Sequence, residues 1–280
     1  MSLQTTYSKK LEAGRLQPVP LKAFIKEALG NMKKIAVINQ KGGVGKSSSA
    51  AAIGKGLSLK GYRVLFIDLD AQGNLSFIMG AKTGADKKIR LLEKPETSKE
   101  LIQKTEQGDI IANSLSMAGA DQLITETGKE FKLREALENL EGLYDYVIID
   151  TPPALGILTV NALTACDEAI IPAQADIFSL QGIEQLSNTI DVVKKYTNSA
   201  LKVAGIVLTR YNGRAVISRD IAEATEATAA KLHTKLYNTK IRECTAIKEA
   251  QARRQDIYSY APRSNAAKDY EALVEEIIGK

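Results

Sequence analysis

The segment Lys34–Ala50, with the sequence KIAVINQKGGVGKSSSA, places the strongest constraint on the fold of this chain. A short apolar run predicts a buried strand, a glycine-rich loop follows, and a run of Ala and Ser predicts a helix. Strand, glycine loop and helix in this order are typical of a phosphate-binding loop. In such a loop, backbone N–H groups and the helix N-terminus face an anion. We therefore expect Lys46 to contact the β- and γ-phosphates of a nucleotide and the Ser47 hydroxyl to contact Mg²⁺.

This loop departs from the general pattern G-x-x-x-x-G-K-[ST] at its beginning. Gln40 occupies the position of the first glycine, and a second lysine, Lys41, opens the loop instead. This departure is the most informative feature of the sequence.

Composition sets outer limits on the class of protein. The 280 residues are 44% hydrophobic and 25% charged, and no apolar run approaches the ~18 residues that a membrane span requires. Cys166 and Cys244 lie far apart and form no metal-binding pattern, so we expect a cytosolic protein. Bases are concentrated at 1–34 (seven against two acids) and at 231–268 (nine against three). Such clusters indicate a polyanion partner, with a solvated basic face as the alternative.

Apolar runs and helical patterns alternate from the phosphate loop to the C-terminus. Strands are expected at 34–39, 63–68, 109–113, 144–150, 168–172 and 202–208, and helices at 47–60, 75–80, 131–143, 155–165, 180–196, 219–235 and 269–278. This alternation predicts an α/β fold: a doubly wound, mostly parallel sheet flanked by helices on both faces. We expect two parts, a basic N-terminal arm at 1–33 with a short helix near 21–29, and one domain at 34–280 that carries the phosphate loop.

Three carboxylates follow apolar strands, where a parallel sheet gathers its ligands. Asp150 ends the run VIID, a placement beside the metal, and Asp68 and Asp70 end the strand after the loop helix. Asp70 is placed to orient or deprotonate a water aimed at the γ-phosphate. Capping of a following helix is the alternative for any one of them. Three carboxylates downstream of a phosphate loop favour nucleotide chemistry.

Several segments of the chain resemble the ParA/MinD family of P-loop ATPases, which has a deviant Walker A motif. The segment KGGVGKS (41–47) is similar to that motif, with Lys41 as its defining extra lysine, and VIIDTPP (147–153) is similar to Walker B. DLDAQGN (68–74) resembles the ParA form of Walker A′, in which proline usually stands at the position of Ala71. IPAQADIFSLQG (171–182) and YAPRSNAAKDY (260–270) also resemble ParA segments, so the resemblance covers about 34–280.

The resemblance implies ATP and Mg²⁺ as cofactors and a weak basal ATPase that a partner stimulates. Lys41, Lys46 and Asp70 would serve catalysis, with Lys41 reaching across a dimer interface, and Ser47 and Asp150 would hold Mg²⁺. The resemblance assigns the nucleotide to two segments, namely Lys41, Gly42, Gly43, Val44, Gly45, Lys46, Ser47 and Ser48 in the loop, and Arg210, Tyr211 and Asn212 near adenine.

For the cellular role, the resemblance implies an ATP-dependent homodimer, associated with the nucleoid, that binds DNA non-specifically and partitions DNA with a ParB-like centromere-binding protein. The expected DNA-binding bases are Arg242, Lys248, Arg253 and Arg254. A MinD-like membrane or cargo-positioning ATPase is the alternative, but the C-terminal sequence DYEALVEEIIGK is acidic on its polar face and disfavours a membrane. A nitrogenase-iron-protein relative would need cysteine motifs that the chain lacks.

Overall fold

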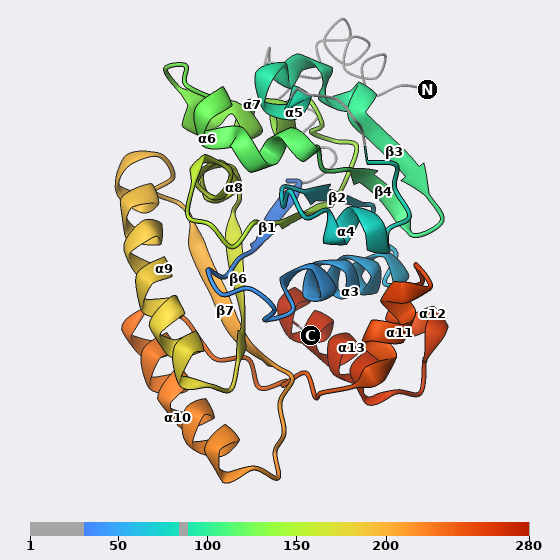
Figure 1. Ribbon diagram of the computed structural model, residues 1–280, viewed down its shortest axis with the longest axis vertical. Helices are drawn as coiled ribbons and strands as arrows, with labels where there is room; N and C mark the ends of the chain where they lie inside the picture. The colour runs from blue at the N-terminus through green and yellow to red at the C-terminus, as the bar shows by residue number, and fades with distance from the viewer. Residues whose placement is uncertain (1–30, 84–88, 280) are drawn as a thin grey trace, which may run out of the picture.

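The computed structural model describes residues 31–83 and 89–279, and its centre is a seven-stranded sheet (Figure 1). The spatial order is β3-β4-β2-β5-β1-β6-β7, and every neighbouring pair is parallel except β3 and β4. The strands are β1 (Lys33–Val37), β2 (Val64–Asp68), β3 (Ile102–Thr105), β4 (Gly108–Ile111), β5 (Tyr146–Asp150), β6 (Glu168–Gln174) and β7 (Lys202–Thr209).

Helices cover both faces of the sheet and bury an apolar layer on each (Figure 1). One face carries α3 (Lys46–Leu59), α4 (Asn74–Ile78), α11 (Thr245–Ala252), α12 (Ile257–Tyr260) and α13 (Asn265–Ile278). The other carries α5 (Arg90–Glu93), α6 (Ala120–Leu123), α7 (Lys132–Glu138), α8 (Ile157–Ala165), α9 (Ile177–Tyr196) and α10 (Val216–Lys231). Short 3₁₀ turns at Pro95–Leu101, Leu115–Gly119 and Lys129–Phe131 complete the second layer. Because both faces are covered, the central strands are almost entirely apolar.

The strand register brings the predicted site residues to one edge of the sheet. Asp150 at the end of β5 is paired in register with Asp68 at the end of β2 and with Val37 at the end of β1. The glycine loop leaves β1 in the middle of the sheet, between β5 and β6. Segments far apart in the chain therefore converge on the phosphate loop, as expected for a doubly wound sheet.

Helix α3 lies close against the sheet and is locked in place by the C-terminal helix. A Cβ added at Gly54 would stand 2.2 Å from the Phe66 ring of β2, so a larger residue there would force α3 away from the sheet. From α13, the buried Tyr270 hydroxyl lies 3.1 Å from Ser49 Oγ, one turn after the start of α3. The helix that begins at the phosphate loop is thus held on both sides.

The predicted fold class is confirmed, and each expected strand lies within a few residues of an observed one. The start of α9 was placed three residues too late, because Asp176 begins this helix by accepting a hydrogen bond from Ser179 N. Sequence patterns missed β3, an antiparallel edge strand of four residues, and also the short helices α11 and α12. The predicted arm helix near 21–29 lies outside the described residues, and the division at 33/34 stays a prediction. No helix in the described part of the chain has the length and apolar character needed to cross a bilayer.

Candidate nucleotide-binding site

Two glycines give the loop after β1 its shape. Gly43 and Gly45 have φ values of 75° and 88°, in the left-handed region that side chains other than glycine rarely adopt. Two side chains fix carbonyl groups of the loop: Thr209 Oγ1 donates to Val44 O at 2.7 Å, and Gln174 Nε2 donates to Gly43 O at 3.0 Å. The residue at the N-cap of α3, Gly45, has no side chain to cap the helix, so the N–H groups of the first turn can face an anion.

The loop forms one wall of a hollow of about 520 Å³, in the size range of small-molecule sites. The other walls come from the segment after β2, from the loops after β5 and β7, and from the end of α11. The lining residues are Gly42, Gly43, Gly45, Lys46, Ser47, Ser48, Asp70, Gln72, Asn74, Phe77, Ile78, Pro153, Arg210, Gln251 and Ala252. Six of the predicted loop residues therefore share one hollow with Asp70 and Arg210.

Lys46 places a positive charge in a largely buried position. Its side chain is 6% exposed, and its Nζ donates to the carbonyl oxygen of Lys41 at 3.2 Å. Burial lowers the pKa of Lys46, and the negative charges of Asp150 and Asp70 oppose this shift. Within the described residues Lys46 forms no direct ion pair, so a bound phosphate would supply the contacting counter-charge that Asp150 and Asp70 do not provide.

Asp150 is a fully buried carboxylate, and neither of its oxygens has a hydrogen-bond partner among the described residues. Its pKa is raised well above the usual value by burial and by the charge of Asp68. The Ser47 hydroxyl, which lies near Asp150 but outside hydrogen-bond geometry, and the charge of Lys46 offset only part of this rise. An unsatisfied carboxylate is costly to bury, and a cation or its bound water would satisfy it. Asp150 and Ser47 therefore fit the hard, oxygen-rich coordination of Mg²⁺, and their role as metal ligands stays a prediction.

Asp68 is equally buried and has a different role. Its Oδ2 accepts hydrogen bonds from Ser76 N and Ser76 Oγ, both at 2.7 Å, and its Oδ1 accepts one from Asp70 N at 3.1 Å. Burial raises the pKa of Asp68 to about 6, although the bonds from Ser76 oppose the rise. These contacts anchor α4 to the end of β2. They agree with the alternative interpretation of Asp68, in which its carboxylate stabilises the start of the following helix.

Asp70 lies in the nucleotide hollow at 7% exposure. One of its oxygens accepts from Gln72 N at 3.0 Å, which fixes the turn that leads into α4. This position suits the predicted orientation of a water near the γ-phosphate.

Lys41 points away from the hollow and toward the start of α9. Its Nζ lies 2.6 Å from Asp176 Oδ2 and 5.9 Å from the centre of the Phe178 ring. The backbone N–H of Lys41 donates to Asn39 Oδ1 at 2.9 Å. Asp176 was not singled out from the sequence, because 135 residues separate it from Lys41. A contact between Lys41 and a second subunit remains a prediction.

Of the three residues predicted to lie near adenine, Arg210 differs in position from the other two. Arg210 lines the nucleotide hollow and a neighbouring one beside α11, and it has a φ of 48°. Tyr211 and Asn212 line neither of these two hollows. Tyr211 instead packs on Lys240, whose Nζ lies 5.6 Å from the ring centre, and Asn212 Oδ1 accepts from Arg214 N.

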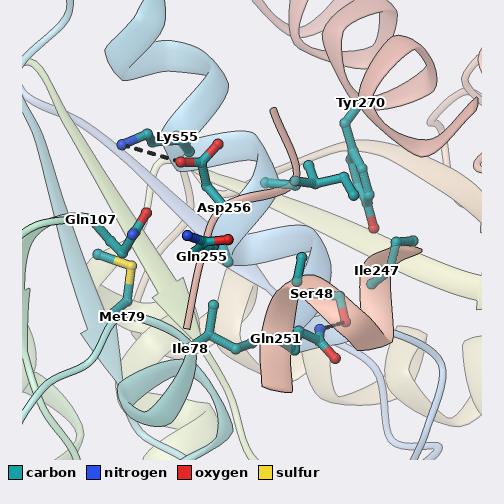
Figure 2. A pocket seen from close by; sticks show the side chains of 14 residues that line it. Ser48, Lys55, Ile78, Met79, Gln107, Ile247, Gln251, Gln255, Asp256 and Tyr270 are labelled. Atoms are coloured by element: carbon teal, nitrogen blue, oxygen red, sulfur yellow. Dashed lines mark hydrogen bonds and ion pairs between the residues drawn. The ribbon is translucent and has the colours of Figure 1, made fainter. Parts of the chain in front are cut away.

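Helix α11 supplies the wall of the site that sequence patterns missed. Figure 2 shows Gln251 directed at Ser48 of α3, and Gln251 Nε2 donates to Ser48 Oγ at 2.6 Å. Gln251 and Ala252 both line the nucleotide hollow. The stretch containing α11 was notable only for its bases, and eight residues give too weak a periodicity to identify a helix.

The four predicted DNA-binding bases do not form one patch. Arg242 makes a two-pronged ion pair with Asp269 of α13, with Nη2 to Oδ1 at 2.6 Å and Nε to Oδ2 at 2.9 Å. Lys248 is exposed on α11 and lines the hollow beside Arg210. Arg253 and Arg254 follow the last residue of α11 and line a separate hollow.

Comparisons with known proteins agree with this geometry. A family model described as an AAA domain matches residues 32–203. Over 250 residues, the chain is 36% identical to the sporulation initiation inhibitor protein Soj of Bacillus subtilis, an alignment that covers 88% of this chain and 98% of Soj. It is 35% identical to the chromosome partitioning protein ParA of Myxococcus xanthus, with 87% of each chain covered.

Among solved structures, a Mycobacterium smegmatis protein described as cobyrinic acid a,c-diamide synthase, with bound ADP and magnesium, superposes with a TM-score of 0.75. It is 30% identical to this chain, and the match covers 88% of this chain and 94% of that one. The long matches to Soj and ParA confirm the resemblance inferred from the motifs. The chain belongs to the family of ParA and Soj partition ATPases.

Proposed function

We propose that this protein hydrolyses ATP in a Mg²⁺-dependent reaction and cycles between a monomer and an ATP-bound dimer that binds DNA without sequence preference. A ParB-like protein at a centromere complex would stimulate hydrolysis, and the protein would act in the cytoplasm on the nucleoid. The observation that carries this proposal is the phosphate loop beside the buried, unpartnered carboxylate of Asp150. That arrangement is costly to maintain unless a metal–nucleotide complex binds there.

In the proposed reaction, each residue acts through its position in the hollow. The loop N–H groups and Lys46 would bind the β- and γ-phosphates, and Ser47 and Asp150 would hold Mg²⁺, which neutralises charge that develops on the phosphates. Asp70 would orient the attacking water. Arg210 is the one arginine of the described residues that lines the nucleotide hollow, so basal turnover would be slow and partner-dependent.

The pair Lys41–Asp176 supports a nucleotide-dependent dimer. Lys41 lies outside its own nucleotide hollow, so its charge is available at the surface once Asp176 releases it. A γ-phosphate of a second subunit offers more negative charge than the Asp176 carboxylate does. ATP would therefore hold two subunits together, and ADP would hold them less well.

Helix α13 supports DNA, rather than a membrane, as the surface on which the protein acts. Its apolar residues pack on α3 and on the sheet, with Tyr270, Leu273 and Val274 buried. An amphipathic membrane anchor needs a free apolar face, and α13 has already buried its own.

The first test concerns hydrolysis. Asp70→Ala should retain ATP affinity within about threefold, accumulate the dimer, and lose phosphate release by a factor on the order of 10². The matched control is Asp191→Ala, which removes an exposed carboxylate of α9 and should hydrolyse ATP like the wild type. Wild-type turnover in Asp70→Ala would remove Asp70 from the mechanism.

The second test concerns DNA. With a non-hydrolysable ATP analogue, the wild type should bind unrelated duplexes of equal length with equal affinity. Arg253→Glu/Arg254→Glu should abolish binding but not dimerisation. If the wild-type dimer binds no duplex DNA, a cargo-positioning ATPase becomes the better account.

A further inference from the structure

A second and larger hollow lies at the far end of α11 from Lys248. It has a volume of about 1040 Å³ and opens between the β3–β4 hairpin, the segment after α4 and the turn after α11. Four bases line it: Lys82, Lys104, Arg253 and Arg254. We call it the basic hollow. Two of these bases were predicted from the sequence, and the two lysines come from segments to which no function has been assigned.

The bases of the basic hollow are exposed, and none of the four forms an ion pair within residues 31–83 and 89–279. Glu106 is the one carboxylate among its lining residues, so the lining carries three more positive than negative charges. Arg242, by contrast, is neutralised by Asp269. Like charges that are held close together repel each other, and they attract polyanions.

Side-chain amides tie the walls of the basic hollow together. Gln103 of β3 accepts from Lys82 N at 2.9 Å and donates from Nε2 to Lys82 O at 2.8 Å. Gln107, in the turn of the hairpin, donates from Nε2 to Arg254 O at 3.2 Å. The backbone positions of Lys82 and Arg254 are therefore both fixed relative to the hairpin that carries Lys104.

Aromatic rings orient the two arginines. The Arg254 guanidinium carbon lies 4.7 Å from the centre of the Phe77 ring, and that of Arg253 lies 5.4 Å from the centre of the Tyr260 ring. Because arginines already occupy both rings, neither is free to stack a nucleotide base, as single-strand binding would require. Phe77 lies in α4, which follows Asp70 in the chain, and it also lines the nucleotide hollow. The position of the Arg254 side chain therefore depends on this segment.

We propose that the basic hollow binds the phosphate backbone of duplex DNA, with Lys82 and Lys104 contacting phosphates opposite Arg253 and Arg254. The β3–β4 hairpin is then one wall of the DNA-binding surface. Contacts made by charge alone read no sequence, which agrees with non-specific binding. This inference rests on the proposed function and adds to it the hairpin lysines as DNA ligands.

The test compares two charge-matched double variants by fluorescence anisotropy, using a mixed-sequence duplex and a non-hydrolysable ATP analogue over a salt series. Lys82→Glu/Lys104→Glu alters the basic hollow. Lys202→Glu/Lys231→Glu makes the same charge change at β7 and at the end of α10, toward the opposite edge of the sheet. The first variant should lose affinity at least tenfold more than the second. Its log–log salt slope should become shallower by about 1.8 per protomer, for two lost phosphate contacts.

Phosphate release without DNA and the ATP-dependent sedimentation of the dimer should be unchanged in both variants, since neither pair of lysines lies in the nucleotide hollow. The milder Lys82→Gln/Lys104→Gln should show the same slope change if charge reversal harms folding. If the wild type binds DNA and the two double variants have equal affinity and equal salt slope, this inference is overturned. The proposed function then remains intact. A wild-type dimer that binds no duplex would overturn both.

Discussion

The nucleotide hollow and the basic hollow meet at α4 and α11, and each gathers positive charge in a different way. The nucleotide hollow uses backbone N–H groups of a left-handed glycine loop and one buried lysine, Lys46. The basic hollow uses four long side chains that are exposed to solvent. Phe77 lines the first, and its ring lies under Arg254 in the second.

The difference predicts two kinds of anion binding. In the nucleotide hollow the donors are fixed and partly desolvated, so each interaction is strong and depends on geometry. In the basic hollow the charges remain hydrated, so each contact is weak and screened by salt. One chain can thus combine tight binding of a single small ligand with loose, reversible binding of a polymer.

The largest expected effect concerns Lys46. Lys46→Ala should weaken ATP binding on the order of 10² to 10³-fold, because a buried charge-assisted contact to phosphate is lost. Isothermal titration calorimetry measures this directly. Lys41→Ala serves as the comparison: it should keep monomer affinity within about threefold and lose ATP-dependent dimerisation in sedimentation. Loss of affinity in Lys41→Ala and not in Lys46→Ala would reverse the two assignments.

A smaller effect should separate the two hollows by salt alone. From 50 to 200 mM salt, DNA affinity should fall on the order of 10²-fold, if the four bases of one basic hollow each contact a phosphate. ATP affinity should change less than about threefold over the same range, because its contacts are buried. Anisotropy with labelled duplex and labelled nucleotide measures both. If the affinities for DNA and for ATP fall by the same factor, the proposed difference between the two hollows is wrong.

Within the nucleotide hollow, the two buried strand-end carboxylates should respond in opposite ways. Asp150→Asn should lower Mg²⁺-dependent nucleotide affinity about tenfold and leave the free energy of unfolding equal or about 1 kcal/mol higher, because an unpartnered buried charge is removed. Asp68→Asn should lower that free energy by about 1–3 kcal/mol, since an amide cannot accept all the bonds now made from Ser76 and Asp70. Urea unfolding and titration with Mg²⁺–ADP measure the two quantities. A stability loss in Asp150→Asn larger than that in Asp68→Asn would contradict the distinction.

The smallest effect concerns the other pair of predicted DNA-binding bases. Arg242→Gln should lower the melting temperature by about 2–4 °C, because it leaves Asp269 without its ion pair. Lys248→Gln should leave the melting temperature unchanged, since Lys248 is exposed and unpaired within the described chain. Calorimetry measures both variants. If Arg242→Gln reduces DNA affinity and not stability, then Arg242 belongs with Arg253 and Arg254 after all.

Much of the fold could be predicted because its signals are local. The phosphate loop, the strand VLFID and the strand YVIID are contiguous patterns, so the strand–loop–helix units and the strand-end aspartates are evident from a few residues each. The elements that were missed, β3 and α11, have four and eight residues and no complete period of burial. β3 depends on its pairing with β4, and α11 depends on contacts with α3, which is distant in the chain.

The sequence by itself determined the family, the phosphate loop and the set of carboxylates at the strand ends. Only the tertiary structure decided which carboxylate is satisfied, since Asp68 meets Ser76 while Asp150 meets no donor in the described chain. It also decided that Lys41 meets Asp176, that Arg242 is neutralised, and that Lys82 and Lys104 join Arg253 and Arg254. Local patterns follow from backbone geometry and side-chain periodicity over a few residues. The partner of a charge, in contrast, is set by which strands and helices the fold brings together, and the sequence separation ranges from 8 residues for Asp68 and Ser76 to 135 for Lys41 and Asp176.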